Sequence, residues 1–468
     1  MSSFSTGLYG STLSSIVSNV NDAFSGKTSG IDVGSVVSEL MQVEDQPEVQ
    51  MQNQQTTIQS QVTALTGIGT QLTALYDSVN SLTDILGAFS QKTTGSSDDA
   101  LVSATADNTA TAGTHTVTVS KLATTSSSYS AYIPSGTSLG GTQLVVKYGS
   151  DPGNPLSTDT INIPSTDTTL QQAASFINSG SYGATASVLT DSQGSRLVLV
   201  SKTSGAAGNL TVSSPATSFT GSAGVDAQLT VDGVPVDSAS NTVTGTIPGV
   251  TLSLGAADPN TSVLISVQPD TTQAAGAIQD FVTAYNAVIT SINSQYSLNS
   301  SGQEGVLAGD SMLRSLQSSL LSMVAASTSG SGPYVNLQSM GIEMQDDGTL
   351  QVNSTNLSQA LSSNFSDVQN FFQSTKGWGQ VTGAQMLQLT DPTLGPVAAD
   401  INGLNQTSQS LTDQINDFET RMTAVQDQLT TQYDNLNTLL QEYPMQLQEI
   451  AGQLASLPNA NASSSNQS

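Results

Sequence analysis

Hydrophobic residues return every three or four positions in two long segments near opposite ends of the chain. The first stripe consists of Ile58, Val62, Leu65, Ile68, Leu72, Leu75, Val79, Leu82, Leu86 and Phe89. This spacing predicts an amphipathic helix. The second stripe keeps heptad spacing and consists of Leu411, Ile415, Phe418, Met422, Val425, Leu429, Leu436, Leu439 and Tyr443, with Gln432 at its one polar position. It predicts a coiled-coil seam.

Between these segments the period of the pattern changes to two. Alternating residues predict short strands at 114–119, 143–148, 185–189, 196–200, 228–231, 250–254 and 262–267. Asp232-Gly233 is a strong hairpin signal, and residues 170–178 have the spacing of a short helix. The region 113–270 is therefore predicted to be β-rich, in two small domains.

Helical spacing returns after Asp270, with helices expected at 278–292, 311–324 and 354–372. Between the last two, residues 340–352 have the pattern of a hairpin around Asp346-Asp347-Gly348. This acidic turn also suggests calcium, but it lacks the spaced oxygen ligands of an EF-hand loop. The turn chemistry favours a hairpin.

Each terminal helical region needs a partner for its apolar stripe. The simplest solution pairs the N-terminal helix with the C-terminal helix, and packing against other copies is the competing solution; both can hold. The predicted fold class is multidomain α+β, with a terminal α-helical coiled-coil stalk and inserted antiparallel β-rich head domains. The expected parts are a disordered tail at 1–30, leg helices at 31–57 and 420–468, a helical stalk domain with a β-hairpin at 58–111 and 271–419, a β-rich head domain at 112–132 and 223–270, and an inserted α/β head domain at 133–222.

The charge balance narrows the choice of partners. Nine Lys and Arg face 36 Asp and Glu, which gives a net charge of −27. Nucleic acid and anionic membrane surfaces are disfavoured, because both require clustered cations. No run of 18 apolar residues predicts a membrane span, and the first 30 residues lack the pattern of a secretory signal.

Candidate catalytic chemistry is sparse. The chain has no Cys and a single His, His115, so thiolate or His metal clusters and nucleophile–His catalysis are disfavoured. We expect no cofactor, no metal site and no enzymatic activity. The lone Trp378 is interpreted as a local core anchor, with contact to a partner protein or a sugar as the alternative.

Several short motifs follow one another in an order that resembles the flagellar filament capping proteins (FliD, or hook-associated protein 2). The matching segments are Gly30-Ile31-Asp32-Val33-Gly34, Ala112-Gly113-Thr114-His115-Thr116-Val117, Ile247-Pro248-Gly249-Val250, Phe281-Val282-Thr283-Ala284-Tyr285-Asn286, Gly309-Asp310-Ser311 with Leu313-Arg314, and Asp347-Gly348-Thr349-Leu350. Each motif alone is weak, but their shared order over almost the whole chain is specific. The chain departs from the family in its long segment before Gly30 and in the scarcity of Lys and Arg in its C-terminal coiled coil.

The resemblance implies a function in assembly. Such proteins form a homo-oligomeric ring, here expected to hold four to six copies, at the distal tip of the flagellum outside the cell. The ring retains exported flagellin and promotes its folding and polymerisation. The resemblance also implies export by the flagellar type III apparatus, a FliT-type chaperone on the C-terminal helix, contact with the hook–filament junction protein and, in some bacteria, binding of host mucin or glycan. The alternatives are another axial protein, such as flagellin or a junction protein, and a surface adhesin.

The predicted legs are strongly acidic. Residues 404–457 carry seven Asp and Glu against Arg421 alone, and Lys92 is the only cation of residues 31–92. Ion pairs between flanking positions therefore cannot support the coiled coil in number. The apolar seam must provide the association, and salt should strengthen it by screening the repulsion.

Overall fold

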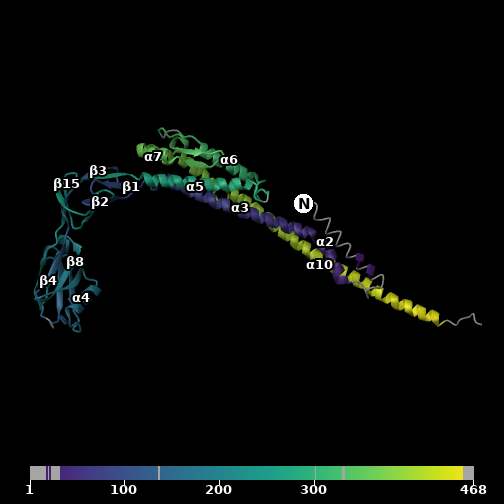
Figure 1. Ribbon diagram of the computed structural model, residues 1–468, viewed down its shortest axis with the longest axis horizontal. Helices are drawn as coiled ribbons and strands as arrows, with labels where there is room; N and C mark the ends of the chain where they lie inside the picture. Colours follow the sequence, from purple (N-terminus) through teal and green to yellow (C-terminus); the bar gives the residue numbers. More distant parts are fainter. Residues whose placement is uncertain are drawn as a thin grey trace, which may run out of the picture.

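The computed structural model describes residues 17–18, 21–22, 32–134, 137–300, 302–328 and 332–456. The molecule is elongated, with two β-rich parts at one end, a helical part in the middle and one long helix that extends to the other end (Figure 1). The fold class is multidomain α+β with paired terminal helices, as predicted. The predicted tail, residues 1–30, lies outside the described residues apart from the short helical pieces at 17–18 and 21–22.

The helical part and the legs are built from segments at both ends of the chain. Their elements are α2 (Val33–Glu44), α3 (Gln46–Thr83), α5 (Thr271–Tyr296), α6 (Ser311–Ala325), the 3-10 helix η2 (Gln338–Met340), β16 (Ile342–Met344), β17 (Leu350–Val352), α7 (Ser354–Ser363), α8 (Phe365–Gln373), α9 (Trp378–Leu389) and α10 (Pro396–Ala455). The predicted hairpin is β16–β17, and Gly348 adopts φ +83° in its turn. Such a backbone favours glycine.

The α3 helix ends earlier than its stripe predicts. Asp84 is extended (φ −67°, ψ 125°), so the helix stops at Thr83. Leu86 is exposed, which makes its assignment to the helical stripe wrong. Phe89 is buried from a turn instead, where its ring stacks on that of Phe372 with centroids 5.4 Å apart.

The first β-rich part packs two sheets around one hydrophobic core. Its strands are β1 (Lys92–Ser96), β2 (Val102–Ala106), β3 (Gly113–Lys121), β11 (Ala227–Val231), β12 (Val234–Ser238), β13 (Thr242–Ile247), β14 (Val250–Leu254) and β15 (Asp258–Pro269). They form sheets of order β1-β15-β3-β11-β12 and β13-β14-β2, with all pairs antiparallel. The expected hairpin at Asp232-Gly233 joins β11 and β12.

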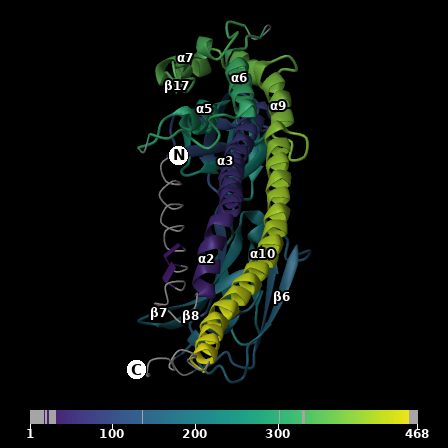
Figure 2. The ribbon, with the colours of Figure 1, turned by 90° about the vertical axis from the view of Figure 1, so that its right-hand side faces the viewer.

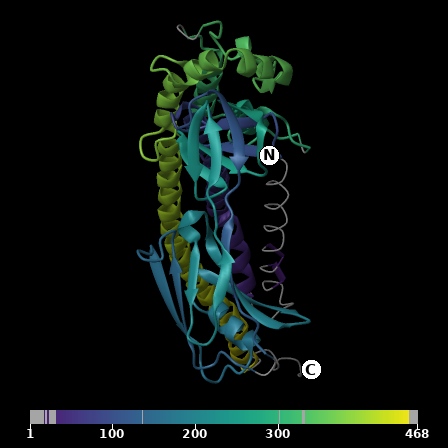
Figure 3. The same ribbon diagram turned by 90° about the vertical axis from the view of Figure 1, so that its left-hand side faces the viewer.

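The second β-rich part has its own core and lies at the end of the molecule (Figure 1), which faces the viewer in Figure 3. Its elements are β4 (Thr125–Ser130), β5 (Gln143–Tyr148), β6 (Ser157–Asn162), α4 (Leu170–Ser179), β7 (Ala184–Asp191), β8 (Gly194–Ser204), the 3-10 helix η1 (Ala206–Gly208), β9 (Leu210–Ser213) and β10 (Phe219–Ser222). The sheets have the orders β10-β4-β8-β7 and β6-β5-β9. The short helix α4 begins with a capping box at Thr169 and Gln172.

Three strands lie in a different part from the one that the sequence pattern indicates. β1 and β2 fall in the range 58–111, which the pattern assigns to the helical stalk, but they pair with β15 and β14 of the first β-rich part. β4 falls in the range 112–132 but pairs with β8 and β10 of the second part. These strands consist mainly of Thr, Ser, Gly and Ala, so they lack the apolar alternation that predicts a strand.

Candidate assembly interface

The terminal helices run side by side in opposite directions. α10 lies along α3 and then along α2, so that successive parts of α10 meet residues ever closer to the N-terminus (Figure 2). Gln55 of α3 donates a hydrogen bond of 2.7 Å from Nε2 to Oγ1 of Thr412 in α10. Further along, Val36 of α2 packs against Tyr433, Leu436 and Leu440 of α10.

The first part of the predicted α10 seam faces inward. Leu411, Ile415 and Phe418 are buried. Met422, Val425 and Leu429 follow as half-buried residues. On the partner side Ile58 and Val62 are half-buried, and Ile58 lines the same hollow as Leu411.

The second part of the predicted seam is displaced by one residue. Leu436 faces α2 as the heptad pattern predicts, but Leu439 is 54% exposed. The pattern assigns contacts to positions 432 and 439. In the structure, Tyr433 and Leu440 make these contacts instead. A straight α-helix repeats every 3.6 residues, so its face drifts from a 3.5-residue repeat by about 20° per heptad. Over three heptads from Leu411 this drift moves the seam to Tyr433 and Leu440. It also explains why Gln432 is polar.

The N-terminal stripe from Leu65 to Leu82 packs within the helical part, where the assignment of 58–111 and 271–419 to one domain places it, and its assignment to a two-helix coiled-coil seam is wrong. Leu65, Leu72, Leu75, Val79 and Leu82 are buried in the core of the helical part, together with α5, α6 and α9, rather than on a two-helix seam. The apolar face of α5, from Ile278 to Ile292, covers them. The N-terminal helices and α10 therefore form a pair without other helices only at N-terminal positions before about residue 60.

Beyond α2 the long helix exposes large apolar side chains. They are Leu439, Tyr443, Met445, Ile450 and Leu454, each more than half exposed. Tyr443, a predicted seam residue, is 65% exposed because α2, whose Val36 packs on residues 433–440, begins only at Val33. Leu439, Tyr443, Ile450 and Leu454 share one face of the helix, whereas Met445 lies on the other side. This shared face, called the apolar stripe, 439–454, lies at the end of the molecule opposite to the β-rich parts (Figure 1).

The interface has almost no ionic support. Within the described part of the chain, no Lys or Arg forms an ion pair with a carboxylate; the one such contact joins His115 Nδ1 and Asp232 Oδ2 at 2.7 Å. Arg421, the single cation of 404–457, places its guanidinium 5.5 Å from the centre of the Phe418 ring. The apolar contacts and amide side chains thus provide the pairing.

The motif residues of the family resemblance have structural roles where the structure describes them. Asp32 caps α2, because its Oδ1 accepts a hydrogen bond of 3.2 Å from the Ser35 backbone N–H. Asp310 caps α6 through the N–H groups of Met312 and Leu313. Arg314 donates a 3.2 Å hydrogen bond from a guanidinium nitrogen to the carbonyl of Gly309. Ile31 lies outside the described residues.

The Phe281–Asn286 motif belongs to the helical core. Phe281 and Tyr285 are buried, and the Phe281 ring meets Trp378 edge-on with centroids 5.3 Å apart. Burial raises the pKa of the Tyr285 hydroxyl above its usual range. Asn286 holds the hairpin, since its carboxamide bonds both backbone groups of Leu350.

One carboxylate pair joins α10 to α6. Burial, helped by a hydrogen bond and charge repulsion from Asp310, raises the pKa of Asp400 to about 6. Asp400 Oδ2 is buried without a hydrogen-bond partner in the described structure. The pair therefore favours a proton on Asp400 at the base of the long helix.

Trp378 is a core residue, in line with the first of its two interpretations. It is buried, and its Nε1 donates a 2.8 Å hydrogen bond to the Met323 carbonyl.

His115 and Asp232 hold the β11–β12 turn against β3, and this contact lowers the pKa of Asp232. No helix in the described ranges combines the length and the hydropathy that a membrane span requires.

Paired acidic helices, an exposed apolar stripe at one end and β-rich heads at the other define a structural protein whose surfaces serve assembly. Two family models match the chain: "Flagellar hook-associated protein 2 N-terminus" at residues 29–126 and "Flagellar hook-associated protein 2 C-terminus" at residues 224–444. The chain belongs to the flagellar hook-associated protein 2 (FliD) family.

Similar proteins agree over most of the chain. The B-type flagellar hook-associated protein 2 of Pseudomonas aeruginosa is 29% identical over 431 residues, which cover 84% of this chain and 88% of that protein. The Escherichia coli K12 protein is 28% identical over 439 residues, with coverages of 85% and 91%. The crystal structure of the D1-D2-D3 domains of the Escherichia coli flagellar cap protein FliD matches with a TM-score of 0.57 and 26% identity, over 73% of this chain and 99% of that one.

Proposed function

We propose that this chain is the subunit of a flagellar filament cap, a homo-oligomeric ring at the distal tip that retains exported flagellin and promotes its folding and polymerisation. The observation that carries the proposal is the position of the apolar stripe, 439–454. It lies at the far end of an acidic helix, away from the heads, where a neighbouring subunit can cover it. Exposed apolar side chains in a row are typical of protein contact sites.

The two ends of the molecule have separate tasks in this function. The β-rich parts form the plate of the cap, and α10 with α2 forms a leg that reaches between filament subunits. Because the leg is held by apolar and amide contacts with few ion pairs, it can separate and pair again as flagellin inserts. The 31–57 and 420–468 leg assignment and the predicted seam residues are part of this proposal.

Other partners follow from the same role. Flagellin and the hook–filament junction protein are the extracellular partners. A FliT-type export chaperone covers the C-terminal helix before export through the flagellar type III apparatus, since the apolar stripe, 439–454, would otherwise promote aggregation. Binding of mucin or glycan is a separate proposal for the heads, tested by binding of the purified protein to mucin.

Labelling at the filament tip tests the proposal. The chain has no Cys, so an exposed head position such as Ser187 can be changed to Cys and labelled with maleimide-gold as the single thiol of this chain. In a strain that carries only the Ser187→Cys protein, the proposal expects gold at the distal tip of each filament. Gold along the filament shaft would instead indicate another axial component, and gold at the hook junction a junction protein.

A further inference from the structure

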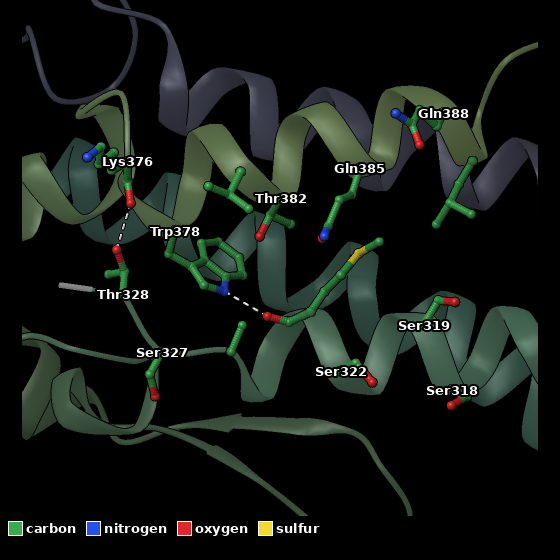
Figure 4. Close-up of a pocket in the computed structure, with 14 residues that line it drawn as sticks. Ser318, Ser319, Ser322, Ser327, Thr328, Lys376, Trp378, Thr382, Gln385 and Gln388 are labelled. Carbon is green, nitrogen blue, oxygen red and sulfur yellow. Dashed lines mark hydrogen bonds between the residues drawn. The ribbon is translucent and has the colours of Figure 1, made fainter.

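A groove of about 480 Å³ lies between α6 and α9 in the helical part (Figure 4). Its walls carry Ser318, Ser319 and Ser322 from α6 and Gln385 and Gln388 from α9. Met323, Val381 and Leu389 add apolar surface. The volume lies in the usual range of binding sites, about 300–1,000 Å³, but the walls are more polar than those of most small-molecule pockets. Such a lining suits a segment of polypeptide.

Two hydrogen bonds brace the groove, and a cation lies at one end. The Trp378 indole is fixed on the Met323 carbonyl, and Thr328 Oγ1 donates a 2.7 Å hydrogen bond to the Lys376 carbonyl (Figure 4). The Lys376 side chain is exposed and has no carboxylate partner among the residues that the structure describes. In a chain of net charge −27, an available ammonium group is a rare feature.

An exposed acidic turn lies on the other side of the same helix. Figure 2 shows β17 and α9 on opposite sides of α6. The hairpin exposes Glu343, Met344, Asp346 and Asp347, while Gly348 rests against Leu321 of α6. Asn293 Nδ2 donates a 2.8 Å hydrogen bond to the Asp347 carbonyl, which holds the turn to α5. Hydrogen bonds from Thr349 lower the pKa of Asp347, so that its carboxylate stays charged.

We propose that the β16–β17 turn of one copy docks into the α6–α9 groove of a second copy, with Met344 on the apolar surface and Asp346 and Asp347 beside Lys376. The turn and the groove lie on opposite sides of α6. Each copy can therefore place its turn on one neighbour and receive the turn of the other neighbour in its groove. Such a head-to-tail contact closes a ring when the rotation between copies allows it. The inference rests on the ring of the proposed function and assigns one of its contacts.

Cross-linking of the full-length protein tests the contact. The double variant Met344→Cys/Ser322→Cys has only the two introduced thiols, and a short bis-maleimide should join neighbouring copies into a ladder that ends at the closed ring. The control Met344→Cys/Leu387→Cys places the second thiol on an exposed α9 residue that does not line the groove. A ladder no stronger than that of the control overturns the inference. Cross-linking of Ser322→Cys to flagellin that carries an introduced Cys, but not to a second copy, also overturns it.

A charge swap adds an independent measurement. Lys376→Glu should weaken self-association at least about tenfold in sedimentation, because it opposes like charges at the contact. Adding Asp346→Lys to that variant should restore most of the association. Equal association of all three proteins contradicts the inference, and circular dichroism checks that each one folds.

Failure of this contact can be distinguished from failure of the proposed function. Wild-type protein that forms rings in electron micrographs but gives no specific cross-link leaves the cap role intact and removes this contact. Wild-type protein that stays monomeric at every concentration, even when bound at filament ends, removes the contact and the ring together.

Discussion

The carboxamide of Asn286 bonds both backbone groups of one residue, Leu350. Asn286 Nδ2 donates to the Leu350 carbonyl at 2.8 Å, and Asn286 Oδ1 accepts from the Leu350 N–H at 2.7 Å. The side chain thus forms the two hydrogen bonds that a neighbouring strand would form with Leu350. This clamp fixes the hairpin on α5, and with it the acidic turn that we assign to a contact between copies.

Removal of the clamp should destabilise the helical part. Asn286→Ala leaves a part-buried donor and acceptor of Leu350 without partners, which we expect to lower the free energy of unfolding by about 2 kcal/mol. Gln279→Ala, an exposed position on the same helix, is the control and should stay within about 0.5 kcal/mol of wild type. Urea unfolding followed by circular dichroism measures both. Equal effects of the two changes would show that the clamp contributes nothing.

The pair of Asp400 and Asp310 predicts a pH dependence. The pKa of Asp400 is about 6 in the folded protein and lies near 4 in an unfolded chain. A raised carboxyl pKa contributes stability that is complete below the unfolded value and is lost as the pH rises through about 6. Asp400→Asn should therefore raise the midpoint of thermal unfolding at pH 7 by about 2 °C and flatten its change between pH 4 and 7.

The exposed Asp413 on the same helix provides the control for this measurement. Asp413→Asn removes the same charge from α10, and we expect it to leave the shape of the pH profile unchanged. A profile for Asp400→Asn that runs parallel to that of wild type would contradict a raised pKa of Asp400.

Two leucines three residues apart on α10 should behave differently. Leu436 packs on Val36, so Leu436→Ala should destabilise the leg of the isolated subunit by about 2 kcal/mol. Leu439 is exposed, so Leu439→Ala should change the stability of the subunit by less than about 0.5 kcal/mol and yet shorten filaments in the cell. Fragment melting and filament length measure the two effects. Full-length filaments with Leu439→Ala would contradict the proposed role of the stripe.

Salt should stabilise the legs. Seven acidic residues and one Arg lie along 404–457, and raising the ionic strength from about 0.01 M to 0.15 M shortens the Debye length from about 30 Å to about 8 Å. The repulsion between like charges then falls while the apolar contacts persist. Circular dichroism of a mixture of N- and C-terminal leg peptides should show helicity that rises with salt. Helicity that falls would indicate that ion pairs hold the legs.

The sequence predicts the helices well where one face stays buried over several turns. Leu411, Ile415 and Phe418 are buried as their spacing indicates, whereas Leu439 is not, because the heptad template accumulates an error of one residue along a straight helix. A period of 3.6 residues identifies Tyr433 and Leu440 from the sequence alone. Periodicity gives the face of a helix but not its partner. The stripe alone could not choose between α5 and the C-terminal helix for Leu65 to Leu82, although the assignment of 58–111 and 271–419 to one domain groups these residues with α5.

Deletion of the gene, followed by return of the wild-type gene, tests the cap role most directly. The measurement is the ratio of unpolymerised flagellin in the medium to flagellin in filaments. The cap role predicts that the deletion strain releases nearly all of its flagellin as monomer and carries short or no filaments, and that the returned gene restores them. Filaments of normal length in the deletion strain would contradict it.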